Sequence, residues 1–93
     1  GNLSLLDNWG LLYLKQNQPQ KALEIYQQLL ARDEEYAKGH ANKGLAYALM
    51  NDADNALKEW DRALELDPRL ASALQNKKLL QETLQGEARA EKN

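Results

Sequence analysis

Apolar residues recur along the chain at the three- and four-residue steps of amphipathic helices. Leu5, Trp9 and Leu12 mark the first such stripe, which ends at the polar residues 16–18. Further stripes follow within 22–30, 37–50, 53–64 and 70–84, and no segment alternates as a half-buried strand does. The pattern therefore predicts an all-α fold of five helices joined by short turns.

Helix-capping and helix-breaking residues predict where these helices begin and end. Asp52 or Asp54 is a candidate cap for the fourth helix, because an aspartate oxygen can accept from its free N–H groups. Pro68 forces the residue before it out of the helical conformation, so the fifth helix should start near this proline. Gly86 is the predicted end of that helix, and residues 87–93 are expected to be a frayed polar tail.

The chain also repeats its residue types every 34 positions. The recurring pairs are Gly10 and Gly44, Tyr13 and Tyr47, Ala22 and Ala56, and Tyr26 and Trp60. A small residue lets two paired helices approach closely, and an aromatic ring fills the space beside it. A helical glycine costs about 1 kcal/mol relative to alanine, so two at one period indicate that close packing offsets the cost. A period of this length is typical of stacked helical repeats.

The repeated residues resemble the tetratricopeptide repeat family. They are Trp9-Gly10-x-x-Tyr13 with Ala22 and Tyr26 in the first unit, and Gly44-x-x-Tyr47 with Ala56, Trp60, Ala63 and Pro68 in the second. The first unit departs from the family pattern at Leu29, where alanine is usual, and at Glu34, where proline is usual. The second unit is the closer match, and both tryptophans are expected to lie in the core.

The resemblance implies one α-solenoid domain of the tetratricopeptide type over residues 1–86. The first repeat would span 3–36 and the second 37–70, and residues 71–85 would form a capping helix. Polar residues on that last helix suit the outer face that a terminal repeat needs for solubility.

The resemblance further implies that the protein is a protein–protein interaction module. The first helices of the units would line a concave groove that binds a peptide or helix of a partner. Similar proteins use asparagines at the position of Asn8, Asn42 and Asn76 to hold an extended peptide, because an amide both donates and accepts hydrogen bonds. The alternative is that asparagine is simply common there. The predicted groove residues are Asn8, Leu11, Lys38, Asn42, Leu45, Asn76 and Leu79.

The composition of this groove indicates an apolar ligand. Chaperone-binding relatives grip a terminal carboxylate with a clamp of lysines and arginines. Here Lys38 is the only basic groove residue, and Asp7 lies nearby in register. An acidic C-terminal tail is therefore not the expected ligand, and the leucines at 34-residue steps suit an apolar peptide or an amphipathic helix.

A second hypothesis is structural. The first helix carries an apolar side with Leu5 and Leu12 that no preceding repeat in this chain would cover. Such a side favours a structural or oligomerisation segment of a larger multi-repeat protein, and it leaves a weak homo-oligomer open.

The composition narrows the remaining classes of function. Twelve basic and fourteen acidic residues give a formal net charge of −2, too balanced to predict a nucleic-acid partner. There is no cysteine, and the single histidine, His40, lacks neighbours at ligand spacing and is expected to pack. We therefore predict no metal, no cofactor and no catalytic site, and so not an enzyme.

No apolar run reaches the roughly 20 residues that would span a bilayer, so no membrane insertion is predicted. We expect a cytoplasmic protein, with a periplasmic location left open if a signal segment has been removed.

Overall fold

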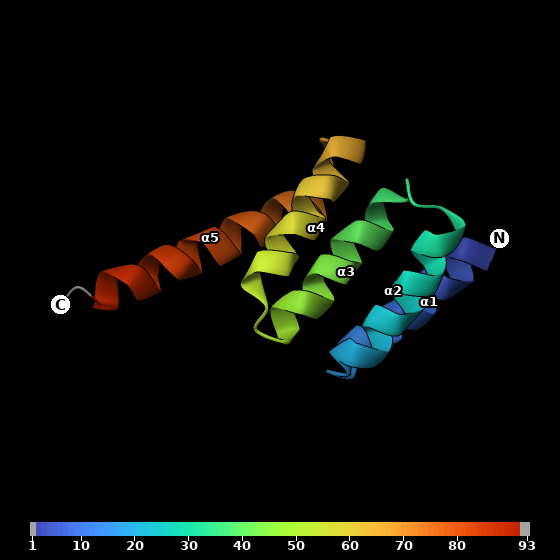
Figure 1. Cartoon of the computed structure of the whole chain (residues 1–93), viewed down its shortest axis with the longest axis horizontal. Helices are drawn as coiled ribbons and strands as arrows, with labels where there is room; N and C mark the ends of the chain where they lie inside the picture. Colours follow the sequence, from blue (N-terminus) through green and yellow to red (C-terminus); the bar gives the residue numbers. More distant parts are fainter. Residues whose placement is uncertain (1, 92–93) are drawn as a thin grey trace.

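The computed structural model describes residues 2–91 and consists, over those residues, of five α-helices without a strand. They are α1 (Asn2–Lys15), α2 (Pro19–Arg32), α3 (Ala37–Leu49), α4 (Ala53–Leu66) and α5 (Ala71–Glu91). Helices α1 and α2 form one antiparallel hairpin, α3 and α4 form a second, and α5 packs last against α4 and α3 (Figure 1). The predicted all-α class is confirmed.

Both hairpins close with the same turn. Asn17 and Asn51 stand 34 residues apart and have φ angles of 56° and 60°. Asparagine tolerates this left-handed conformation better than most residues do, because its short polar side chain can hydrogen-bond locally. In each turn the carbonyl of the repeated tyrosine accepts an N–H at 2.9 Å, from Gln18 to Tyr13 and from Asp52 to Tyr47. These bonds satisfy helix-end carbonyls that would otherwise lack a partner.

The structure decides between the two candidate caps of α4. Asp52 is the N-cap, and its carboxylate accepts the backbone N–H of Asn55 at 3.2 Å. Asp54 instead lies in the first turn of the helix, where an acidic side chain is favoured by the helix dipole.

The fifth helix agrees with the predicted capping helix at its start and differs from it at its end. A turn closed by Leu70 N–H to Asp67 O at 3.1 Å follows Pro68, and α5 begins at Ala71, the first residue of the predicted helix 71–85. At the other end, α5 continues through Gly86 to Glu91. The expected stop at Gly86 is therefore wrong, because good helix formers on both sides outweigh the modest cost of one glycine. Of the predicted tail, residues 92–93 lie outside the described part of the chain.

Two clusters of buried side chains form the core. The first joins α1, α2 and α3 and is built from Leu14, Ala22, Tyr26, Leu29, Leu30 and Ala46. The second joins α3, α4 and α5 and is built from Ala41, Ala56, Trp60, Ala63 and Ala73. Because α3 contributes to both clusters, it connects the two repeats into one hydrophobic interior.

The repeated glycines make room for the repeated aromatic rings, as the pattern predicted. A β-carbon at Gly10 would lie 2.5 Å from the ring of Tyr26, and one at Gly44 would lie 2.6 Å from Nε1 of Trp60. Ordinary carbon contacts are about 3.5–4.0 Å. Any side chain at these two positions would therefore displace a ring that is almost fully buried.

The C-terminal half of α5 is exposed, although Thr83, Leu84 and Glu87 still line a hollow with residues of the α3–α4 turn. Figure 1 shows this half extending away from the other four helices. Residues 81–90 are all exposed, and the helix gives the molecule its long dimension of 51 Å. No helix within residues 2–91 combines the length and the apolar character that crossing a membrane requires.

Candidate functional site

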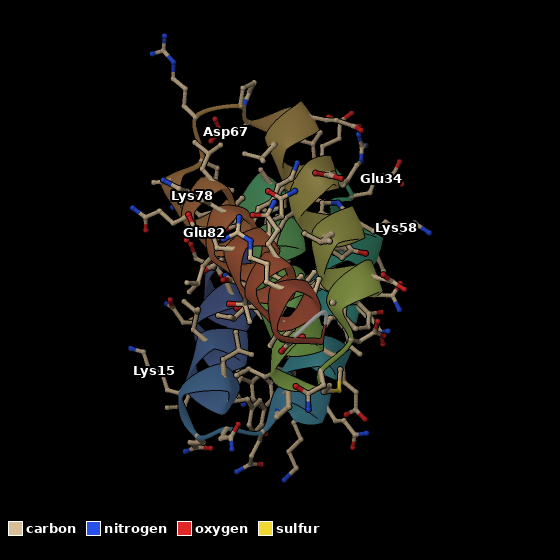
Figure 2. The ribbon with its side chains drawn as sticks, turned by 90° about the vertical axis from the view of Figure 1, so that its left-hand side faces the viewer. Lys15, Glu34, Lys58, Asp67, Lys78 and Glu82 are labelled. Atoms are coloured by element: carbon tan, nitrogen blue, oxygen red, sulfur yellow. The ribbon has the colours of Figure 1, made fainter. Side chains whose placement is uncertain are left out.

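The first helices of the units share one side of the molecule. Helix α3 contacts both α1 and α5. Figure 2 shows α1 and α5 on one side, with α2 and α4 on the other. Lys78 and Glu82 of α5 lie on the α1 side in this view, whereas Glu34 and Lys58 lie on the opposite side. The side that carries the predicted groove is therefore formed by α1, α3 and α5.

The seven predicted groove residues have different environments on this side. Asn8, Lys38 and Leu79 are exposed, whereas Leu11, Asn42, Leu45 and Asn76 are half-buried. Leu11 and Leu45 pack against the first core cluster. The set is therefore not a uniform surface: three of its members line one hollow, and Asn42 belongs to a second group of residues, around Asp7.

The first group surrounds a hollow between α3 and α5. The hollow has a volume of about 190 Å³ and is largely apolar. It is lined by Leu45, Ala48, Trp60, Asn76, Leu79, Leu80 and Thr83. Three predicted residues, Leu45, Asn76 and Leu79, thus come together at one place, and 63% of the Leu79 surface is open to solvent. A leucine so exposed beside an apolar hollow is surface that a partner could cover.

The second group centres on Asp7, which α1 directs inward. Its side chain is only 8% exposed. Its Oδ1 accepts the hydroxyl of Tyr26 and the amide Nδ2 of Asn42, both at 3.0 Å. Its Oδ2 accepts the hydroxyl of Tyr36 at 3.2 Å. Hydrogen bonds from three segments therefore compensate the desolvation of this carboxylate.

This arrangement corrects two features of the predicted groove. Asp7 is buried between the repeats and is not an open groove side chain. Asn42 has a structural partner, because its amide bonds to Asp7, whereas the sequence assigned it only a contact with a ligand. A simple replacement of Asn42 by alanine would therefore disturb the joint between α1 and α3 as well as the surface.

The network also changes the acidity of its tyrosines. Burial raises the pKa of Tyr26 far above its ordinary value, and the charge of Asp7 and the hydrogen bond to it act in the same direction. A hydrogen bond from Asn42 opposes these effects without cancelling them. Burial, followed by the charge of Asp7, also raises the pKa of Tyr36. Both hydroxyls are therefore held protonated, in the form that can donate to the carboxylate.

The second repeat has the equivalent hydrogen bond between its paired helices but no buried charge. Tyr26 also donates to the backbone oxygen of Asp7 at 3.0 Å, and Trp60 donates from Nε1 to the backbone oxygen of Ala41 at 2.9 Å. These bonds are equivalent under the 34-residue period. Where the first repeat has Asp7 with Tyr26, the second has Ala41 with Trp60. That joint change from a polar to an apolar pair is the signal in the sequence that could have revealed the network.

His40 packs at half-buried depth as expected, and it also bridges three segments. Its Nδ1 lies 2.8 Å from the carboxylate of Glu59 on α4, and its Nε2 lies 2.8 Å from the backbone oxygen of Glu34. Lys43 approaches the same Glu59 at 3.5 Å. Within the described residues, no group of three or more potential ligands is placed to hold a metal ion.

The outer side of α1 carries a separate apolar patch. Leu5, Trp9 and Leu12 are all at least half exposed, and Trp9 stacks on Tyr13 with ring centroids 6.3 Å apart. The expectation that Trp9 lies in the core is wrong, because no helix precedes α1 among the described residues. Trp60, in contrast, is 2% exposed and confirms the core prediction for the second tryptophan.

These features define a helical-repeat protein of the kind that serves as a scaffold for protein–protein interaction. The profile of the tetratricopeptide repeat matches the chain at residues 4–36 and 37–70. The chain therefore belongs to the tetratricopeptide repeat family, whose general role is to mediate interactions between proteins.

A solved structure supports the same fold. The NMR structure of the first TPR domain of the human RPAP3 protein superimposes with a TM-score of 0.85 at 22% sequence identity. The match covers 95% of this chain and 69% of that chain. No protein in the curated comparison matches the sequence.

Proposed function

We propose that the side formed by α1, α3 and α5 binds a peptide or helix of a partner protein, with an apolar side chain of the ligand in the hollow between α3 and α5. The observation that carries this proposal is the convergence of Leu45, Asn76 and Leu79 on one largely apolar hollow. The family resemblance, which implies a groove lined by the first helices, and the 34-residue register together predicted these residues from the sequence. They come from two different helices, as a site that recognises an extended ligand requires.

The exposed leucine sets the energetic scale of such binding. Full burial of a leucine side chain contributes about 1.5–3 kcal/mol, and Leu79 is mostly exposed in the free protein. A hollow of about 190 Å³ admits one or two apolar side chains, not a large ligand. The expected complex is therefore of weak to moderate affinity, as suits one module among several.

The test compares two exposed leucines on different surfaces. A displayed library of random linear peptides is selected on the wild-type protein, and selected peptides are measured against Leu79→Asp and Leu5→Asp by fluorescence anisotropy. Leu79→Asp should weaken binding about 10- to 100-fold, because the charge removes the apolar contact. Leu5→Asp, on the outer side of α1, should leave peptide binding unchanged. Circular dichroism verifies that both variants fold.

Equal affinities of the wild type and Leu79→Asp for every selected peptide would refute the proposal. So would a library that yields no binder at all at concentrations where moderate affinity is detectable.

The apolar patch on α1 favours a second candidate function, as a structural or oligomerisation segment. Leu5, Trp9 and Leu12 form a stripe whose largest exposure is 68% at Leu5, and a stripe of this kind is typical of surfaces that pack against another helix. Light scattering on the same samples over a range of concentrations separates the candidates. Association that Leu5→Asp abolishes and Leu79→Asp spares would support the structural role.

A further inference from the structure

The carboxylate of Asp7 determines how Asn42 presents its amide. An ionised carboxylate only accepts hydrogen bonds, so the atom of Asn42 that lies 3.0 Å from Asp7 Oδ1 must be the donor Nδ2. The amino group of Asn42 is thus directed into the joint between the repeats.

The other amide atom of Asn42 is available to a ligand. Because the amide is planar, Oδ1 points away from the Nδ2 side. No hydrogen bond among the described residues reaches this oxygen, and none of their side-chain oxygens is both buried and unpaired. Since Asn42 is half-buried, its Oδ1 is therefore not fully buried and keeps some contact with solvent.

Building on the proposed function, we propose that Asp7 is a positioning residue that turns Asn42 into a hydrogen-bond acceptor, so that the ligand must supply an N–H donor at this point. Leu45 follows Asn42 by three residues on α3, which puts the two on one face about 5–6 Å apart. A peptide with an apolar side chain in the hollow therefore presents its donor, a backbone amide or a lysine or arginine side chain, one helical turn away.

The same geometry discriminates against carboxylates. A ligand carboxylate at Asn42 would meet an acceptor oxygen and, behind it, the negative charge of Asp7. Lys38, one turn earlier on α3, is exposed and would tolerate an acidic group at its own end. The face therefore changes its preference along α3, from acidic groups near Lys38 to N–H donors at Asn42.

One arm of the test needs no ligand. In NMR spectra of isotopically labelled wild-type protein, the two Nδ2 protons of Asn42 should be shifted from free-amide positions and exchange slowly with water. In Asp7→Asn the new side-chain amide can donate a hydrogen bond to Asn42 Oδ1, so the Asn42 amide can flip. The shifted, slowly exchanging Nδ2 signals of Asn42 should then be lost. An Asn42 side chain in the wild type that behaves as a free amide would overturn the proposal.

The second arm uses the peptides selected above. Each backbone N–H of a Leu79-dependent peptide is methylated in turn, which removes one donor at a time. At one position, methylation should lower the affinity of the peptide for the wild type about three- to tenfold. The same methylation should leave its affinity for Asn42→Ala almost unchanged. The peptide with an aspartate substituted at that position should bind Asp7→Asn better than it binds the wild type.

The outcomes separate the two proposals. If binding depends on Leu79 but no methylated or aspartate-bearing position distinguishes the variants, the inference about Asp7 is wrong and the proposed function stands. If no peptide depends on Leu79, both are wrong. If Asp7→Asn fails to fold, the wild-type NMR spectrum and the comparison of wild type with Asn42→Ala still decide the question.

Discussion

The sharpest consequence of the packing is that one chemical change, glycine to alanine, should have opposite effects at two positions. In Gly44→Ala the new β-carbon would lie 2.6 Å from Nε1 and 2.7 Å from Cδ1 of Trp60, and 3.1 Å from the backbone oxygen of Ala56. In Gly86→Ala the new carbon would have no neighbour within 4 Å. Both glycines lie inside helices, so the intrinsic gain in helix propensity is about 1 kcal/mol for each.

The size of the destabilisation by Gly44→Ala depends on the cost of displacing the buried ring of Trp60. Overpacking of this kind costs about 1–3 kcal/mol. Trp60 is 2% exposed and its Nε1 donates to Ala41 O at 2.9 Å, so moving the ring would also cost a hydrogen bond of about 1 kcal/mol. After subtracting the propensity gain, Gly44→Ala should destabilise the domain by about 1–3 kcal/mol. For a domain of this size that lowers the melting temperature by at least about 4 °C.

The assay is urea unfolding followed by far-ultraviolet circular dichroism and tryptophan fluorescence. Gly44→Ala should unfold at a lower urea concentration than the wild type. Gly86→Ala should show an equal or higher midpoint and a stronger helical signal, because α5 is exposed over residues 81–90. A midpoint for Gly44→Ala at or above that of the wild type would refute the close-packing argument. A loss at Gly86 would show that another surface packs on the end of α5.

Two further predictions concern hydrogen bonds. Because burial and the charge of Asp7 raise the pKa of Tyr26 and Tyr36 above the ordinary 10.0, their contribution to stability is complete below about pH 10 and is lost as the pH rises further. Tyrosinate absorbance of the folded protein should therefore extend to higher pH than that of the urea-unfolded chain, and coincident curves would contradict this. Asp52→Ala should cost about 0.5–2 kcal/mol because it removes the N-cap of α4, whereas Asp54→Ala should cost less; equal effects in thermal unfolding would argue against the cap.

The positions of the helices and the packing of the repeated pairs could be predicted because they rest on local signals. The apolar spacing indicates each helix, and Asn17 and Asn51 mark the same turn 34 residues apart. The small and aromatic residues at one period identify which faces meet. Gly44 and Trp60 lie in contact because two helices joined by a short turn have few ways to pack.

Features that depend on a partner far away in the sequence could not be predicted in this way. Trp9 has the apolar character of a core residue, yet it is exposed because burial depends on whether another helix covers α1. The error at Gly86 has a local cause instead: a single glycine that no neighbour contacts lowers helix stability only slightly, so the helix continues through it.

The sequence by itself thus determined the family, the five helices, and the register in which Asn42, Leu45, Asn76 and Leu79 recur. Only the tertiary structure decided what those residues meet. Asp7 accepts hydrogen bonds from partners 19, 29 and 35 residues away. Periodicity cannot show that such a carboxylate is buried and accepts a hydrogen bond from a side-chain amide. Periodicity specifies the face of a helix on which a residue lies. The direction and the partners of a polar side chain depend on which donors the folded chain brings within hydrogen-bonding distance.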